Sequence, residues 1–247
     1  MVTEEHTYPQ TIYIARNTIS NQTYSCYYED AGVHQITFYG TGTGYSASYD
    51  NIAAISFANN SYLAGISGSL GALFPTISPA STMGNQPRFY QTFYNCTNLA
   101  GSIPENLFSG IWGYPTYRMF VSTFQSCSKL TGSIPENLFG NIAGNMDYET
   151  FTSTFGDCSG LSGYVPKSLF ENITGNSYYM NGIFYHTNLL TKCPVGTKQY
   201  TTGFESRWNS KVACEQVYQM MMQNSVFILK PHNQKNPKIS RMNLSAP

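Results

Sequence analysis

Charge is scarce in this chain, and that scarcity already excludes some functions. Lys, Arg, Asp and Glu together make up only 11% of the 247 residues, and the formal net charge is zero. Proteins that bind nucleic acids usually carry a basic surface, so the composition argues against nucleic acid as a partner. Basic residues do outnumber acidic ones from Lys192 onward, which is typical of a basic tail rather than a basic binding face.

Long apolar runs are also missing. No stretch of about 18 apolar residues occurs, so the sequence contains no candidate membrane-spanning helix. The first residues lack the positive flank and the apolar stretch of a secretory signal. The abundance of Tyr, Thr, Ser and Asn, together with few lysines, is nevertheless typical of exported proteins. We therefore expect an extracellular or cell-surface protein whose sequence is a fragment or a processed form.

The motifs of common active sites are absent as well. The four histidines lie in unlike contexts, and no Gly-x-Ser-x-Gly elbow accompanies them. The glycine-rich run from Gly40 to Gly44 lacks the Gly-Lys-Ser/Thr ending of a phosphate loop. Cysteines never occur in the close pairs typical of zinc sites. The sequence therefore predicts that the protein is not an enzyme and has no catalytic residue, no cofactor and no metal.

An internal repeat is the main positive feature of the sequence. The segment from Phe93 to Phe108 matches those from Phe124 to Phe139 and from Phe155 to Phe170, and the offset is 31 residues both times. The register continues into the segments that connect the matches. The positions kept in all three copies include Phe93, Phe124 and Phe155; Cys96, Cys127 and Cys158; Leu99, Leu130 and Leu161; Gly101, Gly132 and Gly163; Pro104, Pro135 and Pro166; Gly113, Gly144 and Gly175; and Tyr117, Tyr148 and Tyr179.

The spacing of apolar residues predicts the elements of each repeat. Apolar residues from Met119 to Cys127 recur at intervals of one, three and four, the stripe of a short helix, and Leu107 to Ile111 shows a similar stripe. The intervening segment from Leu99 to Ile103 suits a short strand. We expect a short strand followed by two short helical pieces in each 31-residue coil. Because one coil cannot bury its apolar side alone, the coils are expected to stack.

The recurring pattern Phe-x-x-Cys-x-x-Leu-x-Gly-Ser-Ile-Pro-x-x-Leu-Phe resembles the bacterial leucine-rich repeats of BspA-like surface proteins. The resemblance covers roughly residues 66–190 and implies an α/β repeat solenoid that is exposed at a bacterial surface and used for adhesion or protein binding. The sequence departs from leucine-rich repeats in two ways: its period exceeds their usual 20 to 29 residues, and it has few coils. The solenoid is expected to span residues 61–192.

The flanks do not share the repeat. Alternating apolar residues such as Ile36 and Phe38 predict strands within residues 1–60, as a small β-rich cap on the first coil or as an independent mini-domain. Cys193 and Cys214 could close a C-terminal cap over residues 193–215 by a disulfide in an oxidising compartment. The final segment, 216–247, is expected to contain one short helix over 217–229 and a disordered basic remainder.

Two repeated rows of side chains invite a functional interpretation. The row of Cys96, Cys127 and Cys158 lies on the apolar stripe, so it is best interpreted as buried core. Cys26 is either a buried free thiol or an intermolecular partner. The exposed aromatic row is the candidate binding site, and it comprises Tyr117, Tyr148 and Tyr179, joined by Trp112 and Tyr114 in the first connecting loop.

Two hypotheses follow for the function. The first is a non-enzymatic surface or secreted recognition module that binds a host or neighbouring-cell protein or glycan through its solenoid face. The second is a structural spacer or display element with no specific ligand, in which the tyrosine row only holds neighbouring coils together. Equivalent exposed positions such as Glu105, Glu136 and Lys167 diverge, as expected for a binding face, but three coils are too few to decide.

Overall fold

A computed structural model describes residues 28, 31–50, 53–163, 165–175, 177–189, 226–229 and 240–243. Few of these residues are in regular secondary structure, and the helices among them have three or four residues each. In chain order the elements are α1 (Leu70–Leu73), η1 (Met83–Asn85), β1 (Gly144–Asn145), η2 (Lys167–Phe170), β2 (Ile173–Thr174), η3 (Ser177–Met180), β3 (Val226–Leu229) and β4 (Ser240–Asn243). The η elements are 3-10 helices.

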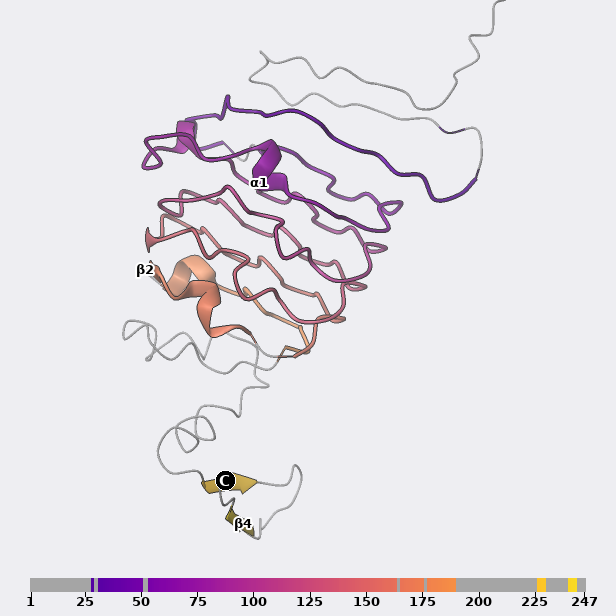
Figure 1. Cartoon of the computed structure of the whole chain (residues 1–247), viewed down its shortest axis with the longest axis vertical. Coiled ribbons are helices and arrows are strands. Elements are labelled where there is room, and N and C mark those ends of the chain that lie inside the picture. Colours follow the sequence, from indigo (N-terminus) through magenta and orange to yellow (C-terminus); the bar gives the residue numbers. More distant parts are fainter. Residues whose placement is uncertain are drawn as a thin grey trace, which may run out of the picture.

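Successive repeats lie on top of one another as flat coils, with α1 near one end of the stack and β2 near the other (Figure 1). Neighbouring coils pair in parallel, as β1 does with β2. Isolated parallel bridges join the coils at further points, among them Gly101 with Leu130 and Gly132 with Leu161. Backbone hydrogen bonds between coils therefore provide the pairing that long strands supply in a regular sheet.

The segment expected to be helical, Met119 to Cys127, is instead a chain of tight turns. Hydrogen bonds from the N–H of Met119, Thr123 and Cys127 to the carbonyl three residues earlier close three consecutive turns. The third residue of each turn has a positive φ, which is the mark of a type II turn; these residues are Arg118 (50°), Ser122 (52°) and Ser126 (65°). Consecutive four-residue turns and an α-helix both place apolar residues on one side about every four residues. The apolar pattern of the sequence therefore could not distinguish the two structures.

The turn conformation leaves alternate N–H groups free to reach the next coil. The N–H groups of Phe120, Ser122 and Phe124 donate to carbonyls of the following coil at 2.8–2.9 Å. A helix would have used the same groups internally. Turn geometry thus replaces intrahelical bonding with bonding between coils, and it fixes the register of the stack.

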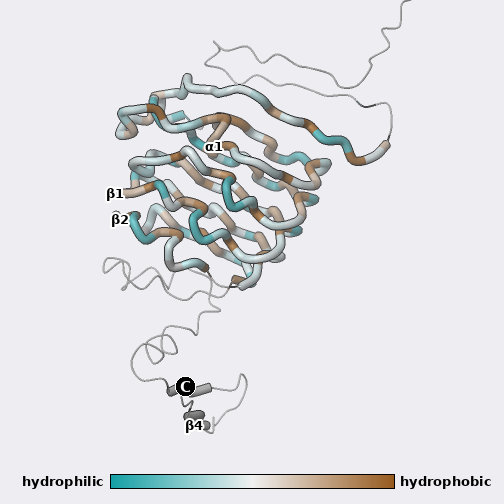
Figure 2. The backbone as a smooth tube through the Cα atoms, in the orientation of Figure 1, coloured by the Kyte–Doolittle hydropathy of each residue, from teal (hydrophilic) through white to brown (hydrophobic). Residues whose placement is uncertain are grey.

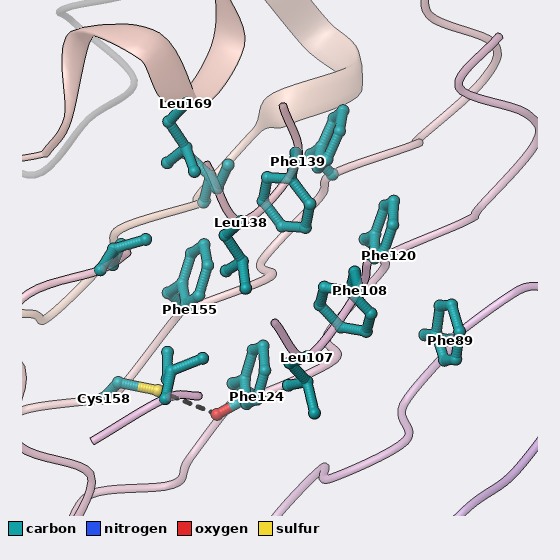
Figure 3. Packing of buried hydrophobic residues seen from close by; sticks show 14 of the residues in the cluster. Phe89, Leu107, Phe108, Phe120, Phe124, Leu138, Phe139, Phe155, Cys158 and Leu169 are labelled. Atoms are coloured by element: carbon teal, nitrogen blue, oxygen red, sulfur yellow. Dashed lines mark hydrogen bonds between the residues drawn. The ribbon is translucent and has the colours of Figure 1, made fainter. Parts of the chain in front are cut away.

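Phenylalanine ladders fill the interior. Hydrophobic and hydrophilic stretches follow one another along the stacked coils (Figure 2), and the repeated phenylalanines, leucines and isoleucines form one buried cluster. Rings of successive coils stack on one another, as Phe124 and Phe155 do in Figure 3, with centroids 5.5 Å apart and planes tilted by 5°. Phe93 continues this ladder, 5.4 Å from Phe124 and tilted by 15°. Burial of such rings supplies most of the stabilising free energy that a repeat cannot obtain alone.

The N-terminal segment lies along the first coil, although none of its described residues forms a strand. We expected a β-rich piece over residues 1–60, whereas 31–50 and 53–60 contain only turns, bends and irregular backbone. Backbone N–H groups of Ala54, Phe57 and Asn59 still donate to the first repeat at 2.7–2.8 Å. The ring of Phe57 also continues a core ladder, 5.6 Å from Phe93.

The C-terminal segment differs from its expected helix. Strands β3 and β4 pair antiparallel, with Val226 opposite Asn243 and Leu229 opposite Ser240. Residues 226–229 are thus extended where we expected a helix over 217–229, and 240–243 form a strand where we expected disorder. Three cysteines of the sequence hypotheses, Cys26, Cys193 and Cys214, lie outside the described residues, so the proposed disulfide stays a prediction.

Candidate functional site

A row of tyrosines follows the stack on its outer surface. The rings of Tyr117 and Tyr148 stack with centroids 6.0 Å apart, and those of Tyr148 and Tyr179 are 5.7 Å apart. They align because each follows a repeat glycine by four residues, and the glycine opens the loop that leads into the first turn of its coil. Tyr148 is 47% exposed, whereas the other two are partly buried. The row thus offers ring edges and faces to solvent while its members support one another.

Tyr49 extends this row by one ring and was missed in the sequence. Its ring meets that of Tyr117 edge-on, with centroids 5.0 Å apart and an angle of 83° between the planes. The side chain is 66% exposed. No repeat signal could have found it, because residues 41–50 lie outside the 31-residue register. We refer to Tyr49, Tyr117, Tyr148 and Tyr179 as the tyrosine row.

Trp112 and Tyr114 are exposed but do not join the tyrosine row by any ring contact within the described residues. The backbone of Trp112 is held by the Thr76 hydroxyl and the Gln86 side chain at 3.0 and 2.9 Å. The ring of Tyr114 covers Gly144 of the next coil, where a Cβ would lie 2.6 Å from the ring. Of the five predicted binding residues, the structure therefore brings three into one row and places two beside it.

An ion pair borders the tyrosine row. Arg118 contacts Glu149 of the next coil at 2.6 Å through Nη2 and at 2.7 Å through Nε, both to the same oxygen. The guanidinium also lies 5.2 Å from the centre of the Tyr117 ring and 5.8 Å from that of Tyr148. The nearby Glu149 carboxylate raises the pKa of Tyr148. Arg118 and Glu149 are equivalent repeat positions of opposite charge, a signal that the sequence already contained.

A small hollow opens beside Tyr49. Its volume is about 370 Å³. Three separate parts of the chain form it: the N-terminal segment, the loop at η1, and the start of two neighbouring coils. The lining residues are Ala47, Tyr49, Ser81, Thr82, Met83, Gly84, Thr116 and Asp147.

Two polar side chains of the hollow stand out. The Thr116 residue is only 6% exposed, and its buried hydroxyl has no hydrogen-bond partner. Asp147 is exposed and is held in place at both ends, since its N–H donates to the carbonyl of Pro115 at 3.0 Å and its Oδ1 accepts the N–H of Tyr148 at 2.6 Å. The hollow therefore presents a fixed carboxylate, whereas the Thr116 hydroxyl lies beneath its surface.

The cysteine row lies in the core, away from this surface. Cys96, Cys127 and Cys158 are fully buried, and each thiol donates to a phenylalanine carbonyl at 2.9–3.1 Å. The acceptor lies in the N-terminal segment for Cys96 and in the preceding coil for the other two, as drawn for Cys158 and Phe124 in Figure 3. Burial raises the pKa of the Cys127 thiol to about 12 and that of Cys158 well above its ordinary value. Such thiols are poor nucleophiles and poor metal ligands.

Other common kinds of site are not formed within the described ranges. No three His, Cys, Asp or Glu side chains there come together in an arrangement that could hold a metal ion. The helices of these ranges are each far too short to cross a membrane. No protein-family model, curated protein or solved structure gives a significant match to this chain.

Proposed function

We propose that this chain is a non-enzymatic recognition module, secreted by or exposed on a bacterial cell, that binds a protein or glycan of a host or neighbouring cell. In this proposal the stacked coils form a leucine-rich-repeat-like solenoid, and the tyrosine row is its contact surface. One observation supports it above the others: four tyrosine rings from four parts of the chain line up on the outer surface with neighbours 5.0–6.0 Å apart.

Tyrosine suits such a surface for physical reasons. Its side chain offers a large apolar ring and a polar tip but has only two rotatable bonds, so little conformational entropy is lost when a partner binds. Here the rings are held further by contacts with one another and by the Arg118 guanidinium. A preorganised surface of this kind pays less for ordering than a flexible one.

The alternative function is a structural spacer or display element without a specific ligand. It is favoured by the stacking of Tyr117 on Tyr148, with planes only 15° apart, because such rings already satisfy one another. The partial burial of Tyr179, which packs against the core cluster, points the same way. Under this alternative the row strengthens contacts between coils and nothing else.

A binding screen of the full chain separates the two functions. The protein is tested against immobilised matrix proteins and a glycan array, beside a triple variant with Tyr117→Ala, Tyr148→Ala and Tyr179→Ala. We expect specific binding that the triple variant loses. Because Tyr179 supports the core, a second variant with Tyr148→Ala alone guards against loss of folding. Tyr62→Ala is the matched control, since Tyr62 is 94% exposed and lies outside the row.

The variants must be shown to fold, by comparing their thermal unfolding with that of the parent. Binding that disappears in folded Tyr148→Ala but persists in Tyr62→Ala supports the recognition module. Binding that survives both the single and the triple variant would move the contact surface elsewhere. No binding to any probe, together with lower thermal stability of the tyrosine variants, would favour the spacer.

A further inference from the structure

We infer that the hollow beside Tyr49 is a subsite for one neutral sugar unit of a glycan. The inference rests on the proposed recognition function and narrows its ligand from protein or glycan to a glycan with an uncharged residue at this position. Four features of the hollow support it: its size, its aromatic wall, its charge and the fixed position of its walls.

Size limits the occupant to a small unit. Ligand sites in proteins typically enclose about 300 to 1,000 Å³, and the hollow, at about 370 Å³, lies at the low end of that range. A single sugar ring fits this scale, while a folded protein surface would have to insert a protruding side chain. The hollow also continues the tyrosine row through Tyr49, so a longer glycan could run from it along the row.

The side chains that line the hollow suit a sugar ring, which has an apolar face and many hydroxyl groups. Tyr49 is exposed and supplies an aromatic surface with a polar tip, against which the C–H face of a sugar can pack. Ser81 and Thr82 supply hydroxyls that donate or accept, and the Asp147 carboxylate only accepts. A sugar hydroxyl can serve all of these groups because it both donates and accepts.

Charge favours a neutral sugar over an acidic one. Asp147 is the charged side chain of the lining, and it is negative. Two nearby cations are engaged elsewhere: Arg88 is buried and donates to the carbonyl of Asp50 at 2.8 Å, and Arg118 pairs with Glu149. A sialic or uronic acid would therefore bring a second negative charge close to Asp147 without a matching cation in the lining.

The walls are also fixed before any ligand arrives. Asp147 is anchored through its backbone and its side chain, as described above. On the opposite wall the η1 loop approaches the N-terminal segment closely, since a Cβ on Gly84 would lie 3.4 Å from the Cβ of Ala47. The Asn85 side chain ties this loop to the carbonyl of Pro79 at 2.7 Å. Preorganised walls reduce the entropy lost on binding.

The test uses the full chain and methyl glycosides of the common neutral hexoses, with free sialic acid and glucuronic acid as charged comparisons. Affinities are measured by calorimetry, and oligosaccharides that contain the preferred unit are then ranked on a glycan array. The variants are Asp147→Asn, which keeps the shape but replaces the carboxylate, and Tyr49→Ala, which removes the aromatic wall. Tyr62→Ala is again the matched control, and thermal unfolding verifies folding.

We expect a neutral hexoside to bind, with an affinity that falls at least about tenfold in Asp147→Asn and in Tyr49→Ala and that stays unchanged in Tyr62→Ala. Neutral-glycan binding that the hollow variants leave unchanged would overturn the subsite, as would a preference for the acidic sugars.

The outcomes also separate this inference from the proposed function. If only a protein ligand binds and its binding depends on Tyr148, the recognition module stands and the sugar subsite is wrong. If neither sugars nor proteins bind to the folded chain, both proposals fail.

Discussion

The buried phenylalanine ladders and the exposed tyrosine row arise from the same 31-residue register but face different surroundings. Phe124 and Phe155 are fully buried, and their ring planes differ by only 5°. In the tyrosine row the planes of Tyr148 and Tyr179 differ by 59°, those of Tyr117 and Tyr148 differ by 15°, and Tyr148 is 47% exposed. The same spacing thus brings rings together both in the core and at the surface, but the ring geometry varies more in the row. Periodicity aligns side chains, and burial determines whether they stabilise the fold or remain available to a partner.

The largest effect is expected from truncating the buried ladder. Phe124→Ala removes a fully buried ring that contacts rings of both neighbouring coils, so the free energy of unfolding should fall by about 3–5 kcal/mol. Tyr148→Ala, at the exposed row, should cost less than about 1 kcal/mol. Urea denaturation measures both. Equal decreases in the free energy of unfolding would show that the phenylalanine ladder and the tyrosine row stabilise the fold to the same extent, against this expectation.

The next largest effect is expected from a buried threonine hydroxyl that makes hydrogen bonds within the stack. Thr154 donates to the carbonyls of Phe120 and Phe151 at 2.9 and 2.8 Å, so Thr154→Val should reduce the free energy of unfolding by about 1–3 kcal/mol. Thr152 is the matched control, because its buried hydroxyl has no partner and Thr152→Val should be neutral or stabilising. If both variants lost the same stability in urea, the hydroxyl bonds between coils would not matter.

The cysteine ladder predicts a pH dependence of stability. Burial raises the pKa of Cys127 from 9.0 to about 12, so the native state holds this proton where the unfolded state has released it. Stability from this group is therefore complete below pH 9 and falls as the pH rises from 9 to 12. Chemical denaturation of the parent and of Cys127→Ala between pH 8 and 11 measures the difference. A parallel decline in both proteins would contradict this assignment.

The smallest effect is expected at the ion pair that borders the tyrosine row. Arg118 and Glu149 keep 24% and 29% of their side-chain surface exposed, so solvent weakens their attraction. Arg118→Gln should change the free energy of unfolding by no more than about 1 kcal/mol, and added salt should reduce the difference. Denaturation at low and high ionic strength tests this, with Glu149→Gln as the companion variant. A decrease in the free energy of unfolding as large as that of Phe124→Ala would contradict this expectation, because the ion pair would then stabilise the fold as much as a core residue does.

Some of this arrangement could be predicted from the sequence and some could not. The 31-residue offset identifies residues that lie above one another, because a stacked chain brings equivalent positions together, as it does for Tyr117 and Tyr148. The local backbone could not be predicted, since the residues with positive φ in the turns of residues 116–127 are Arg118, Ser122 and Ser126 rather than the Gly or Asn that would mark turns. The hollow was also out of reach, because Tyr49 and the η1 loop have no counterparts in the repeat.

Alternate backbone N–H groups in each coil donate to the next coil, and this arrangement has a consequence for how such a chain can evolve. A duplicated unit of 31 residues, inserted in register, would present the acceptors that the coil before it needs and the donors that the coil after it expects. We therefore expect the fold to accept the insertion or loss of whole units but not of partial ones. Each added unit would lengthen the tyrosine row by one ring, so the reach of the surface could change without any change in the way its residues are held.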